Sequence, residues 1–497
     1  MTTAAMAPKH SKDFLDRRHG LLIDGRFVDA VDGRTFETID PGTGQVLATV
    51  SEGSERDIDA AVEAARRAAE GPWSKMSPSE RGRIVHRIGD LVAEHAEELA
   101  ELESLDSGKP ASAALAVELP LAADMFWYMA GAARRITGTS VTPSVPYMPG
   151  AEFHAYTTRE PLGVAGQIIP WNVPILMAAW KLAPALATGN TVVLKPAEQT
   201  PLTALRIGEL LLEAGLPDGV VNIVPGFGER AGAHLAAHDG VDKIAFTGST
   251  EVGRSIVRAA AGNLKRVSLE LGGKSPNIVL DDADVDAAIA GAALAIFYNQ
   301  GEVCSAGSRL YVHESQFDRV VEGLAEHARG IKVGYGLDPD TDMGPLVSAE
   351  HFERVSRYLD LGKQSGGRTV AGGNVLDRDG YYVEPSVIAR PDRDHPIVRE
   401  EIFGPVVTAL PFSDIDDLAR QANDTIYGLA AGVWTSDLSK AHLLAKRLKA
   451  GTVHVNTYHV FAAELPFGGY KQSGWGREKG DAVLEQYLET KSVVVAL

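Results

Sequence analysis

Cysteine is almost absent from this chain: among 497 residues the only one is Cys304. A single thiol excludes an intrachain disulfide, a zinc site built from several cysteines and an all-cysteine iron–sulfur cluster. Such usage is typical of a reducing compartment, so we expect a cytoplasmic protein. A lone cysteine is most often a small buried hydrophobic residue, and only its surroundings can indicate chemistry.

Long apolar runs and basic blocks are also missing. No stretch of 18 or more uncharged apolar residues offers a membrane span. Residues 1–14 have neither the apolar core of a secretory signal nor the Arg-rich pattern of an import sequence. Lys and Arg number 48 against 66 Asp and Glu, a net charge of −18. We therefore expect a soluble protein that binds neither nucleic acid nor a membrane.

From residue 163 onward, apolar runs of strand length alternate with helical stretches. Strands are predicted at 163–169, 191–194, 220–224, 243–246 and 266–271, with helices at 173–186, 202–212, 230–237 and 251–261. This alternation predicts an α/β fold with a parallel sheet covered on both faces. Nucleotides bind such sheets at the carboxyl ends of the strands.

Further elements lie on either side of this region. Two helices are predicted before it, at 55–70 and 79–105. A second α/β set begins near residue 275, with strands at 277–280, 309–312, near 387, near 406, 432–434 and 452–455, and helices at 285–297, 316–331 and 349–364. The chain ends in an apolar β-type segment, 491–497, with no later partner. Such a tail often adds to another subunit's sheet.

Polar residues follow two of the predicted strands. The Asn172 amide can donate to a developing oxyanion, although an Asn that caps the next helix is the competing interpretation. Glu198 lies about 30 residues into a βαβ unit, where a carboxylate can accept from a ribose hydroxyl and repel a 2′-phosphate. Lys195 can bond the same ribose. A solvated Lys195–Glu198 surface pair is the alternative.

A third cluster spans residues 246–253. Gly248 allows a tight turn, and Ser249 lies at a helix N-terminus, where free amides and the helix dipole favour phosphate. The dinucleotide fingerprint G-x-G-x-x-G is incomplete because Thr250 replaces its second glycine. A simple capping turn explains the pattern equally well.

The fourth cluster pairs Glu270 with Cys304. A Glu among apolar neighbours at a strand end is costly unless it has a task, and burial raises its pKa toward the range of a general base. Cys304 follows a glycine-containing loop and precedes Ser305, so it lies outside any continuous apolar run. A thiolate nucleophile with a carboxylate base suits covalent acyl chemistry.

Two other patterns are rejected as sites. His234 and His238 have the spacing of metal ligands on one helical face, but no third ligand is apparent, since position 235 is Leu. An exposed helix face is the preferred interpretation, and we predict no metal. No G-x-S-x-G elbow with an identifiable triad partner is present.

Taken together and in this order, the clusters resemble the NAD(P)-dependent aldehyde dehydrogenase superfamily from about Leu21 to the C-terminus. The matching segments are Glu270-Leu271-Gly272-Gly273-Lys274-Ser275-Pro276, Gly301-Glu302-Val303-Cys304, Glu400-Glu401-Ile402-Phe403-Gly404-Pro405, Asn456 and Pro466-Phe467-Gly468-Gly469-Tyr470-Lys471. The resemblance implies a Rossmann-type cofactor domain (1–138 and 161–272), a catalytic domain (273–480) and a small β oligomerisation flap (139–160 and 481–497). Homotetramers or homodimers are the family norm.

The resemblance also implies roles for the residues. Cys304 attacks the aldehyde carbon, while Asn172 and the Cys304 backbone N–H hold the oxyanion. Glu270 then activates water to hydrolyse the thioester, and its presence favours a free acid over transfer to coenzyme A. Lys181 and Glu478 match a pair that can relay protons from Glu270, with a structural ion pair as the alternative.

For the cofactor, the resemblance implies NAD more than NADP, because of Glu198. Glu401 is expected to grip the nicotinamide ribose and Phe403 to pack beside the nicotinamide. The remaining contacts implied for the adenosine half, pyrophosphate and neighbouring wall are Ile168, Trp171, Lys195, Gly228, Gly248, Ser249 and Leu271.

The substrate tunnel is implied by family position. It is expected to be lined by Val173, Met177, Trp180, Tyr298, Val303, Ser305, His459, Phe461 and Phe467. This apolar, aromatic wall suits a hydrophobic aldehyde. Residues 14–20 and 152–156 are similar to the phenylacetaldehyde dehydrogenase branch, so we expect an aryl or medium-chain aldehyde. An amino- or betaine-type aldehyde, an esterase activity and a non-catalytic protein on the same fold are the alternatives.

Overall fold

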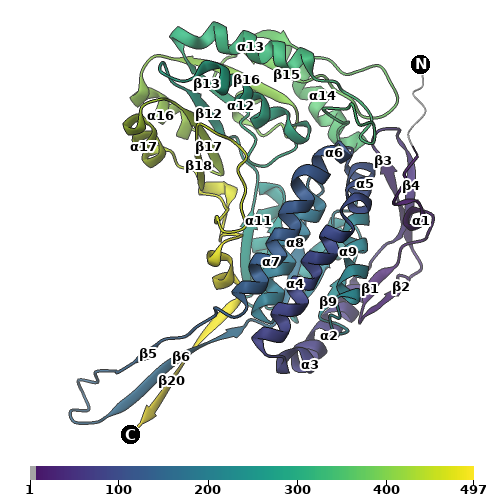
Figure 1. Cartoon of the computed structure of the whole chain (residues 1–497), viewed down its shortest axis with the longest axis vertical. Helices are drawn as coiled ribbons and strands as arrows, with labels where there is room; N and C mark the ends of the chain where they lie inside the picture. The colour runs from purple at the N-terminus through teal and green to yellow at the C-terminus, as the bar shows by residue number, and fades with distance from the viewer. Residues whose placement is uncertain (1–6) are drawn as a thin grey trace.

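The computed structural model describes residues 7–497. It contains two large β-sheets flanked by helices and a narrow sheet that projects from the body (Figure 1). Residues 1–6, part of the N-terminal segment considered above, lie outside the described residues. The predicted α/β class, with parallel strands, is confirmed.

The first sheet has the strand order β19-β11-β10-β7-β8-β9-β1-β2. Its parallel strands are β7 (Val164–Ile168), β8 (Thr191–Lys195), β9 (Val221–Ile223), β10 (Lys243–Thr247) and β11 (Arg266–Glu270). Antiparallel strands complete both edges: β1 (Leu21–Ile23), β2 (Arg26–Val28) and β19 (Gly474–Trp475). Every residue of β7 through β10 is buried, as their apolar sequences require.

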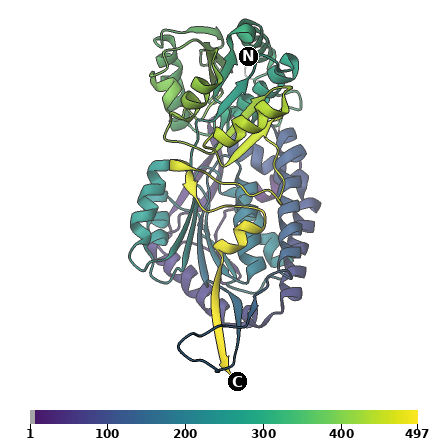
Figure 2. The same cartoon turned by 90° about the vertical axis from the view of Figure 1, so that its left-hand side faces the viewer.

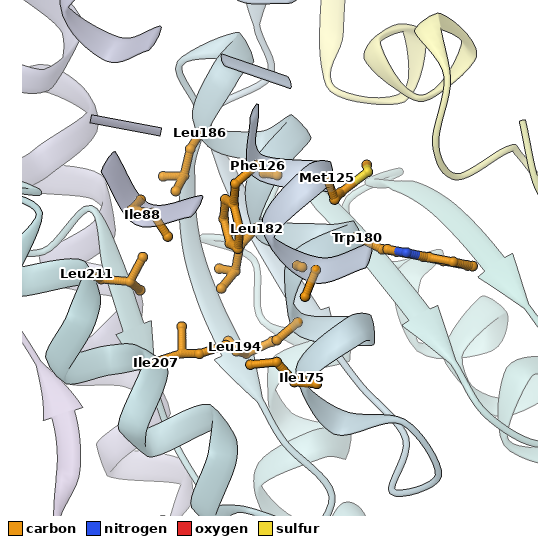
Figure 3. Close-up of a cluster of buried hydrophobic side chains, with 14 of the residues drawn as sticks. Ile88, Met125, Phe126, Ile175, Trp180, Leu182, Leu186, Leu194, Ile207 and Leu211 are labelled. Carbon is orange, nitrogen blue, oxygen red and sulfur yellow. The ribbon is translucent and has the colours of Figure 1, made fainter. Parts of the chain in front are cut away.

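Helices cover both faces of this sheet. On one face lie α4 (Pro78–Glu94), α7 (Leu119–Ala132), α8 (Pro174–Thr188) and α9 (Leu202–Glu213); on the other lie α2 (Glu55–Glu70), α10 (Ala233–Ala237) and α11 (Thr250–Ala260). Figure 3 shows the first face, where Phe126, Leu182 and Leu211 meet between helices. Removing one such side chain, as in Leu182→Ala, costs about 2–5 kcal/mol of folding free energy.

The second sheet has the order β14-β15-β16-β13-β12-β17-β18. Its strands are β12 (Pro276–Val279), β13 (Arg309–His313), β14 (Arg368–Ala371), β15 (Ser386–Ala389), β16 (Val406–Phe412), β17 (Ala430–Trp434) and β18 (Thr452–Val455). Apolar residues of this sheet pack with α12 (Val285–Phe297) and α13 (Phe317–Gly330) in one core cluster. A second cluster includes α14 (Ala349–Lys363), α16 (Ile415–Asn423) and α17 (Leu438–Arg447).

The third sheet joins β5 (Ser140–Val141), β6 (Phe153–Pro161) and β20 (Leu488–Ala496) and projects away from the body, with the C-terminus at its tip (Figures 1 and 2). The C-terminal segment therefore has a partner in its own chain: Leu488 pairs with Pro161 and Ala496 with Phe153. No later strand follows it, as the sequence indicates, and its partner is the earlier strand β6. β20 remains an edge strand, and Val494 on it is 62% exposed.

The predicted helix at 79–105 is two helices, α4 and α5 (Ala96–Ser107), that meet at His95. His95 leaves helical geometry at φ −102°, ψ 21°, while its ring contacts Glu98 (3.1 Å). The break lets α5 pack against α9 while α4 packs against α7. Continuous apolar spacing in the sequence does not reveal such a change of direction.

Smaller elements complete the chain. They are α1 (Lys12–Leu15), β3 (Thr35–Asp40), β4 (Gln45–Ser51), α3 (Pro72–Lys75), η2 (Gly228–Gly232), η3 (Tyr298–Gly301), η4 (Glu314–Gln316), α15 (Pro396–Arg399), η5 (Lys471–Ser473) and η6 (Asp481–Gln486). The predicted helix at 230–237 is the π-helical turn η2 followed by α10. The domain boundaries given above stay a prediction.

One long helical run was not predicted. It spans Ala111–Ala132 and joins α6 (Ala111–Ala113), η1 (Ala114–Glu118) and α7. By length and composition it could cross a membrane, but half of it is buried inside the fold. It carries a buried carboxylate, Glu118, and packs against α4 and α8. We therefore interpret it as a core helix.

The parallel register aligns the strand ends that matter for function. Ile168 at the end of β7 is level with Lys195 on β8 and Phe246 on β10, and Thr247 is level with Glu270 on β11. Side chains predicted from separate stretches of sequence therefore reach the same edge of the first sheet.

Candidate active site

A cavity of about 380 Å³ opens where the ends of β7, β10 and β11 face the half of the molecule built on the second sheet. Its lining includes Asn172, Ser249, Glu270, Cys304, Glu401, Phe403 and Glu478. Six residues predicted for the site lie outside the lining: Ile168, Lys181, Lys195, Glu198, Gly228 and His459. Apart from Lys181, the predicted catalytic and nicotinamide-side residues thus converge on one space.

Cys304 reaches the cavity through an unusual turn. The preceding η3 contains Asn299 and Gln300 in the left-handed region, at φ 49° and 55°, followed by Gly301 at φ 70°. A Cβ on Gly301 would lie 2.3 Å from the Gly404 carbonyl oxygen, so the loop needs glycine there. The thiol is partly exposed. The interpretation of Cys304 as an ordinary core residue is therefore disfavoured.

The Cys304 thiol is protonated at rest. Burial, followed by the nearby carboxylates of Glu270 and Glu401, raises its pKa to about 12. The backbone N–H groups of Ser305 and Cys304 face the sulfur and oppose this shift, and among residues 7–497 the Cys304 N–H has no backbone acceptor. That donor is available to an oxygen bound beside the sulfur.

Asn172 is held by its backbone and presents its amide. Its carbonyl oxygen accepts from Lys109 Nζ (2.8 Å) and from Asn299 Nδ2 (3.0 Å). Its own Nδ2 donates to the Glu302 carbonyl (2.8 Å), which leaves one further N–H for a ligand. The N-cap of α8 is Val173, without a side-chain bond. The competing interpretation of Asn172 as a helix cap is therefore wrong.

Glu270 ends β11 as a buried carboxyl whose two oxygens have no hydrogen-bond partner among the described residues. Burial is the main reason that its pKa lies well above the usual range, and the Glu478 carboxylate adds to the shift while Lys181 opposes it. A raised pKa together with free oxygens is what a general base for water requires.

Lys181 and Glu478 form a buried ion pair between α8 and the C-terminal segment. Glu478 lines the cavity, whereas Lys181 lies behind it. The second carboxylate oxygen of Glu478, Oε2, has no partner among the described residues. The pair is thus both a structural bridge and a group with an open acceptor beside Glu270.

The Lys195–Glu198 pair is not a solvated surface pair. Lys195 is 2% exposed and its Nζ lies 2.8 Å from Glu198 Oε2. Burial lowers the pKa of Lys195, against the pull of Glu198. A buried ammonium beside a half-exposed carboxylate offers both a donor and an acceptor to a vicinal diol such as a ribose.

The start of α11 can receive a phosphate. Ser249 is the N-cap, and its Oγ accepts from the Val252 N–H (3.2 Å), so the capping interpretation holds. The N–H groups of Thr250 and Glu251 have no intrahelical partner. Gly228, the other residue predicted near the pyrophosphate, lies outside the cavity lining, and an added Cβ there would meet no atom within 4 Å. Free amides and open space together fit a pyrophosphate.

Glu401 and Phe403 close the other side of this pocket. Glu401 Oε1 accepts from the Gly273 N–H (2.8 Å), and burial raises the pKa of its carboxyl to about 7. A Cβ on Gly272 would lie 2.0 Å from Glu401 Oε2, so the carboxylate can approach only over a glycine. The Phe403 ring stands edge-on to Trp171 at 5.2 Å. This donor set and this aromatic wall fit a dinucleotide.

One wall of this pocket was missed by sequence reasoning. Helix α14 contributes Glu350, His351 and Arg354 to the cavity lining. His351 Nε2 donates to the Phe403 carbonyl (2.7 Å), and Arg354 donates to the Glu401 carbonyl (2.7 Å). These residues orient the loop that carries Glu401. In the sequence α14 shows only an amphipathic pattern, so no signal distinguished them.

The predicted tunnel is largely assembled. Its members in the cavity lining are Val173, Met177, Trp180, Tyr298, Val303, Ser305, Phe461 and Phe467. His459 lies behind this wall, with its ring 5.8 Å from those of Phe461 and Tyr298. The unpredicted helical run adds Val117, Glu118 and Leu121, and α8 adds Leu176. Glu118 is a carboxylate in a wall expected to be apolar.

Contrary to expectation, a third candidate metal ligand lies beside His234 and His238. Asp59 of α2 lies 2.6 Å from His234 Nε2 and 3.3 Å from His238 Nε2. The Gly240 N–H donates to His238 Nδ1 (2.9 Å), so the proton of the neutral ring sits on Nε2, toward Asp59. A metal at Nε2 would have to displace that proton. We interpret the cluster as a hydrogen-bonded bridge between α10 and α2.

Comparison with known sequences places this geometry in context. Residues 27–493 match the aldehyde dehydrogenase family. The mitochondrial benzaldehyde dehydrogenase of Antirrhinum majus is 50% identical over 479 residues, which cover 96% of this chain and 89% of that protein.

Two solved structures are similar over nearly the whole chain. An NAD+ complex of aldehyde dehydrogenase from Bacillus cereus has a TM-score of 0.97 and 49% identity, and both chains are covered completely. A betaine aldehyde dehydrogenase from Staphylococcus aureus in complex with NAD+ has a TM-score of 0.94 and 42% identity, covering 98% of this chain and 96% of that one.

Proposed function

This chain belongs to the aldehyde dehydrogenase family and is an NAD-dependent aldehyde dehydrogenase; we propose that it oxidises a hydrophobic aldehyde to the free acid through Cys304. The observation that carries the mechanism is the unpartnered, buried Glu270 carboxyl in the same cavity as the Cys304 thiol. A base without an intrachain hydrogen bond and a nucleophile in one enclosed space are the parts of an acyl-transfer site.

In the first step, Cys304 Sγ bonds to the aldehyde carbon as the thiol loses its proton and the carbonyl oxygen gains negative charge. Asn172 Nδ2 and the Cys304 N–H are the donors for that oxygen. Protonation of the oxygen gives a neutral thiohemiacetal. Two donors of this kind stabilise the developing charge more than the neutral carbonyl, which accelerates the attack.

In the second step, the thiohemiacetal carbon loses a hydride and its oxygen releases a proton to solvent, which leaves a thioester on Cys304. Bound NAD+ supplies the hydride acceptor. Glu401 and Phe403 would hold its nicotinamide half, and Trp171, Lys195, Glu198 and the α11 N-terminus its adenosine half and pyrophosphate. The Glu198 carboxylate favours a free ribose 2′-hydroxyl and repels a 2′-phosphate, so we propose NAD over NADP.

In the third step, Glu270 takes a proton from water while the water oxygen bonds to the thioester carbon. The carbon–sulfur bond then breaks, which releases the carboxylic acid and leaves the Cys304 thiolate, and the proton held by Glu270 restores the thiol. When the acid ionises, its proton leaves to solvent, and the pair of Glu478 and Lys181 beside Glu270 is the route we propose for it. The open Glu478 oxygen supports this role, with a structural ion pair as the alternative.

The substrate we propose is an aromatic or medium-chain aldehyde, with phenylacetaldehyde as the test compound. The aromatic faces of Trp180, Phe461 and Phe467 in the cavity lining support it. The relative named as a benzaldehyde dehydrogenase supports the same class. The relative named as a betaine aldehyde dehydrogenase keeps a cationic aldehyde as the second candidate.

We further propose that the projecting sheet of β5, β6 and β20 mediates a homodimer or homotetramer. Its edge strand β20 has exposed apolar residues, and an isolated three-stranded ribbon has little core of its own. A cytoplasmic location stays a prediction from cysteine usage. Sedimentation of the full chain, compared with a Val494→Lys variant, tests the assembly.

The mechanism is tested with purified protein, NAD and phenylacetaldehyde. We expect NADH absorbance from the native chain and none from Cys304→Ala, which should still bind NAD. Turnover that survives in Cys304→Ala would reject the nucleophile. Turnover of an ester without NAD, faster than aldehyde oxidation, would favour the esterase alternative, and inactivity toward all aldehydes would favour a non-catalytic protein.

A further inference from the structure

A lysine ammonium lies against the aromatic wall of the substrate tunnel. Lys479 is 3% exposed, and its Nζ lies 4.6 Å from the Trp180 ring centroid, 5.2 Å from that of Phe461 and 5.6 Å from that of Phe467. Figure 3 shows the Trp180 indole directed away from the leucine cluster of the core. Three tunnel rings thus surround a cation that the chain itself supplies.

The backbone fixes this arrangement. Phe467 and Glu478 exchange two N–H···O bonds of 2.7 Å, and the Gly480 N–H donates to the Ala463 carbonyl at 2.7 Å. Lys479 lies between these bonds in the left-handed region, at φ 59°. Its side chain therefore leaves the backbone in a direction set by neighbours on both sides.

The rings are the direct contacts of this ammonium. Within residues 7–497, no carboxylate lies within 4.0 Å of Lys479 Nζ. Its pKa is lowered to about 8 by burial, while Glu478, Glu270, Cys304 and Glu464 oppose the shift electrostatically. A pKa of about 8 makes this amino group a cation below that pH and a neutral amine above it.

A cage of aromatic faces is also the structure that binds quaternary ammonium ligands. Here Lys479 lies outside the cavity lining, against rings that line it, so a second cation on the cavity side of these rings would meet like charge across them in a desolvated space. We propose that Lys479 is a specificity-determining residue that excludes amino- and trimethylammonio-aldehydes and selects neutral ones. This inference rests on the proposed function and deepens its substrate class.

The test compares two aldehydes of the same shape. Trimethylammonioacetaldehyde carries a positive charge, and 3,3-dimethylbutanal is its neutral isostere. We expect kcat/KM of the native enzyme to favour the neutral aldehyde by at least about thirtyfold, and Lys479→Met to shrink that preference at least about tenfold, mainly through KM for the cation. Lys479→Arg should keep the preference, as should Lys446→Met, which removes an exposed charge elsewhere.

The pH dependence of the substrate preference tests the same proposal in the native enzyme, without a variant. Both aldehydes use the same nucleophile and base, so the pH dependence of the chemical steps cancels in the ratio of their kcat/KM values. The preference for the neutral aldehyde should weaken as the pH rises past about 8 and Lys479 loses its proton. The charged or ionisable side chains that face Lys479 are Glu478, Glu270, Cys304, Glu464 and His454.

Calorimetry with tetramethylammonium separates this inference from the proposed function, since it needs no turnover. We expect no binding to the native chain and measurable binding to Lys479→Met. Equal binding to both, or to neither, would overturn the role of Lys479, as would an unchanged substrate ratio in Lys479→Met. Absence of NADH from 3,3-dimethylbutanal would instead count against the proposed function.

Discussion

Two clusters of buried charge border the same cavity and differ in how their oxygens are satisfied. The Lys109 cluster consists of Lys109, Glu103 and Glu118; the Glu270 cluster consists of Glu270, Glu478 and Lys181. In the first, Lys109 Nζ reaches both Glu118 oxygens at 2.8 and 2.7 Å, and Glu103 accepts from Thr203 Oγ1 at 2.8 Å. In the second, both Glu270 oxygens and one Glu478 oxygen have no partner among the described residues.

Burial by itself does not separate the two clusters. It raises the pKa of Glu103 as well as that of Glu270. The difference lies in hydrogen bonding, because native chains satisfy nearly all buried polar groups, and the unpartnered oxygens of Glu270 and Glu478 belong to residues that line the cavity. We infer that the Lys109 cluster holds the cavity wall in place and that the Glu270 cluster performs chemistry.

The largest expected effect comes from substitution of Glu270, whose carboxyl oxygens have no partner among the described residues. Glu270→Gln keeps the shape but removes the base, so steady-state turnover should fall about 10²–10⁴-fold. Acylation does not require that base, so a burst of NADH approaching one per subunit should remain in rapid mixing experiments. The melting temperature should stay the same or rise, since no hydrogen bond is lost. Unimpaired steady-state turnover would show that Glu270 is not the base, and the two clusters would then no longer differ in function.

The Lys109 cluster should respond in the opposite way, with a loss of stability. Lys109→Met leaves Glu118 buried without its cation, which should lower the free energy of unfolding by about 3–5 kcal/mol. Chemical denaturation measures this loss. The double variant Lys109→Met, Glu118→Leu removes both charges and should recover most of it. A Lys109→Met protein as stable as the native one would show that this cluster is not structural.

The sequence pointed to the Glu270 cluster and not to the Lys109 cluster for a physical reason. Glu270 follows an apolar strand, where a carboxylate stands out against its immediate neighbours. Strand alternation likewise located Asn172, Lys195 and Ser249: Lys195 ends β8, Asn172 lies in the short loop between β7 and α8, and Ser249 caps α11. Features that depend on only a few adjacent residues could be predicted.

Contacts between distant segments could not be predicted. Lys109 meets the Asn172 carbonyl 63 positions away, and Asp59 meets His234 across 175 positions. The Ala111–Ala132 run, which carries Glu118, had no strand pattern beside it to define its place. Periodicity fixes which residues face the core, but the partner of a buried charge depends on how whole elements pack.

A smaller effect sharpens the contrast within the Glu270 cluster. Glu478 raises the pKa of Glu270 and Lys181 lowers it. Turnover limited by hydrolysis should rise with pH as Glu270 loses its proton. Glu478→Gln should move this limb to lower pH and Lys181→Met to higher pH, each by on the order of one unit. The pH profile of kcat measures both, and shifts in the same direction would contradict the assignment.

The smallest effect concerns the edge of the Lys109 cluster. Tyr298 donates to Glu118 Oε1 over 3.4 Å, a long bond to an oxygen that Lys109 already holds at 2.8 Å. Tyr298→Phe removes only this bond, so unfolding should become easier by less than about 1 kcal/mol. The ratio kcat/KM for phenylacetaldehyde should change less than about twofold, because the tunnel keeps its aromatic ring. A loss as large as that of Lys109→Met would mean that Tyr298, and not Lys109, satisfies the carboxylate.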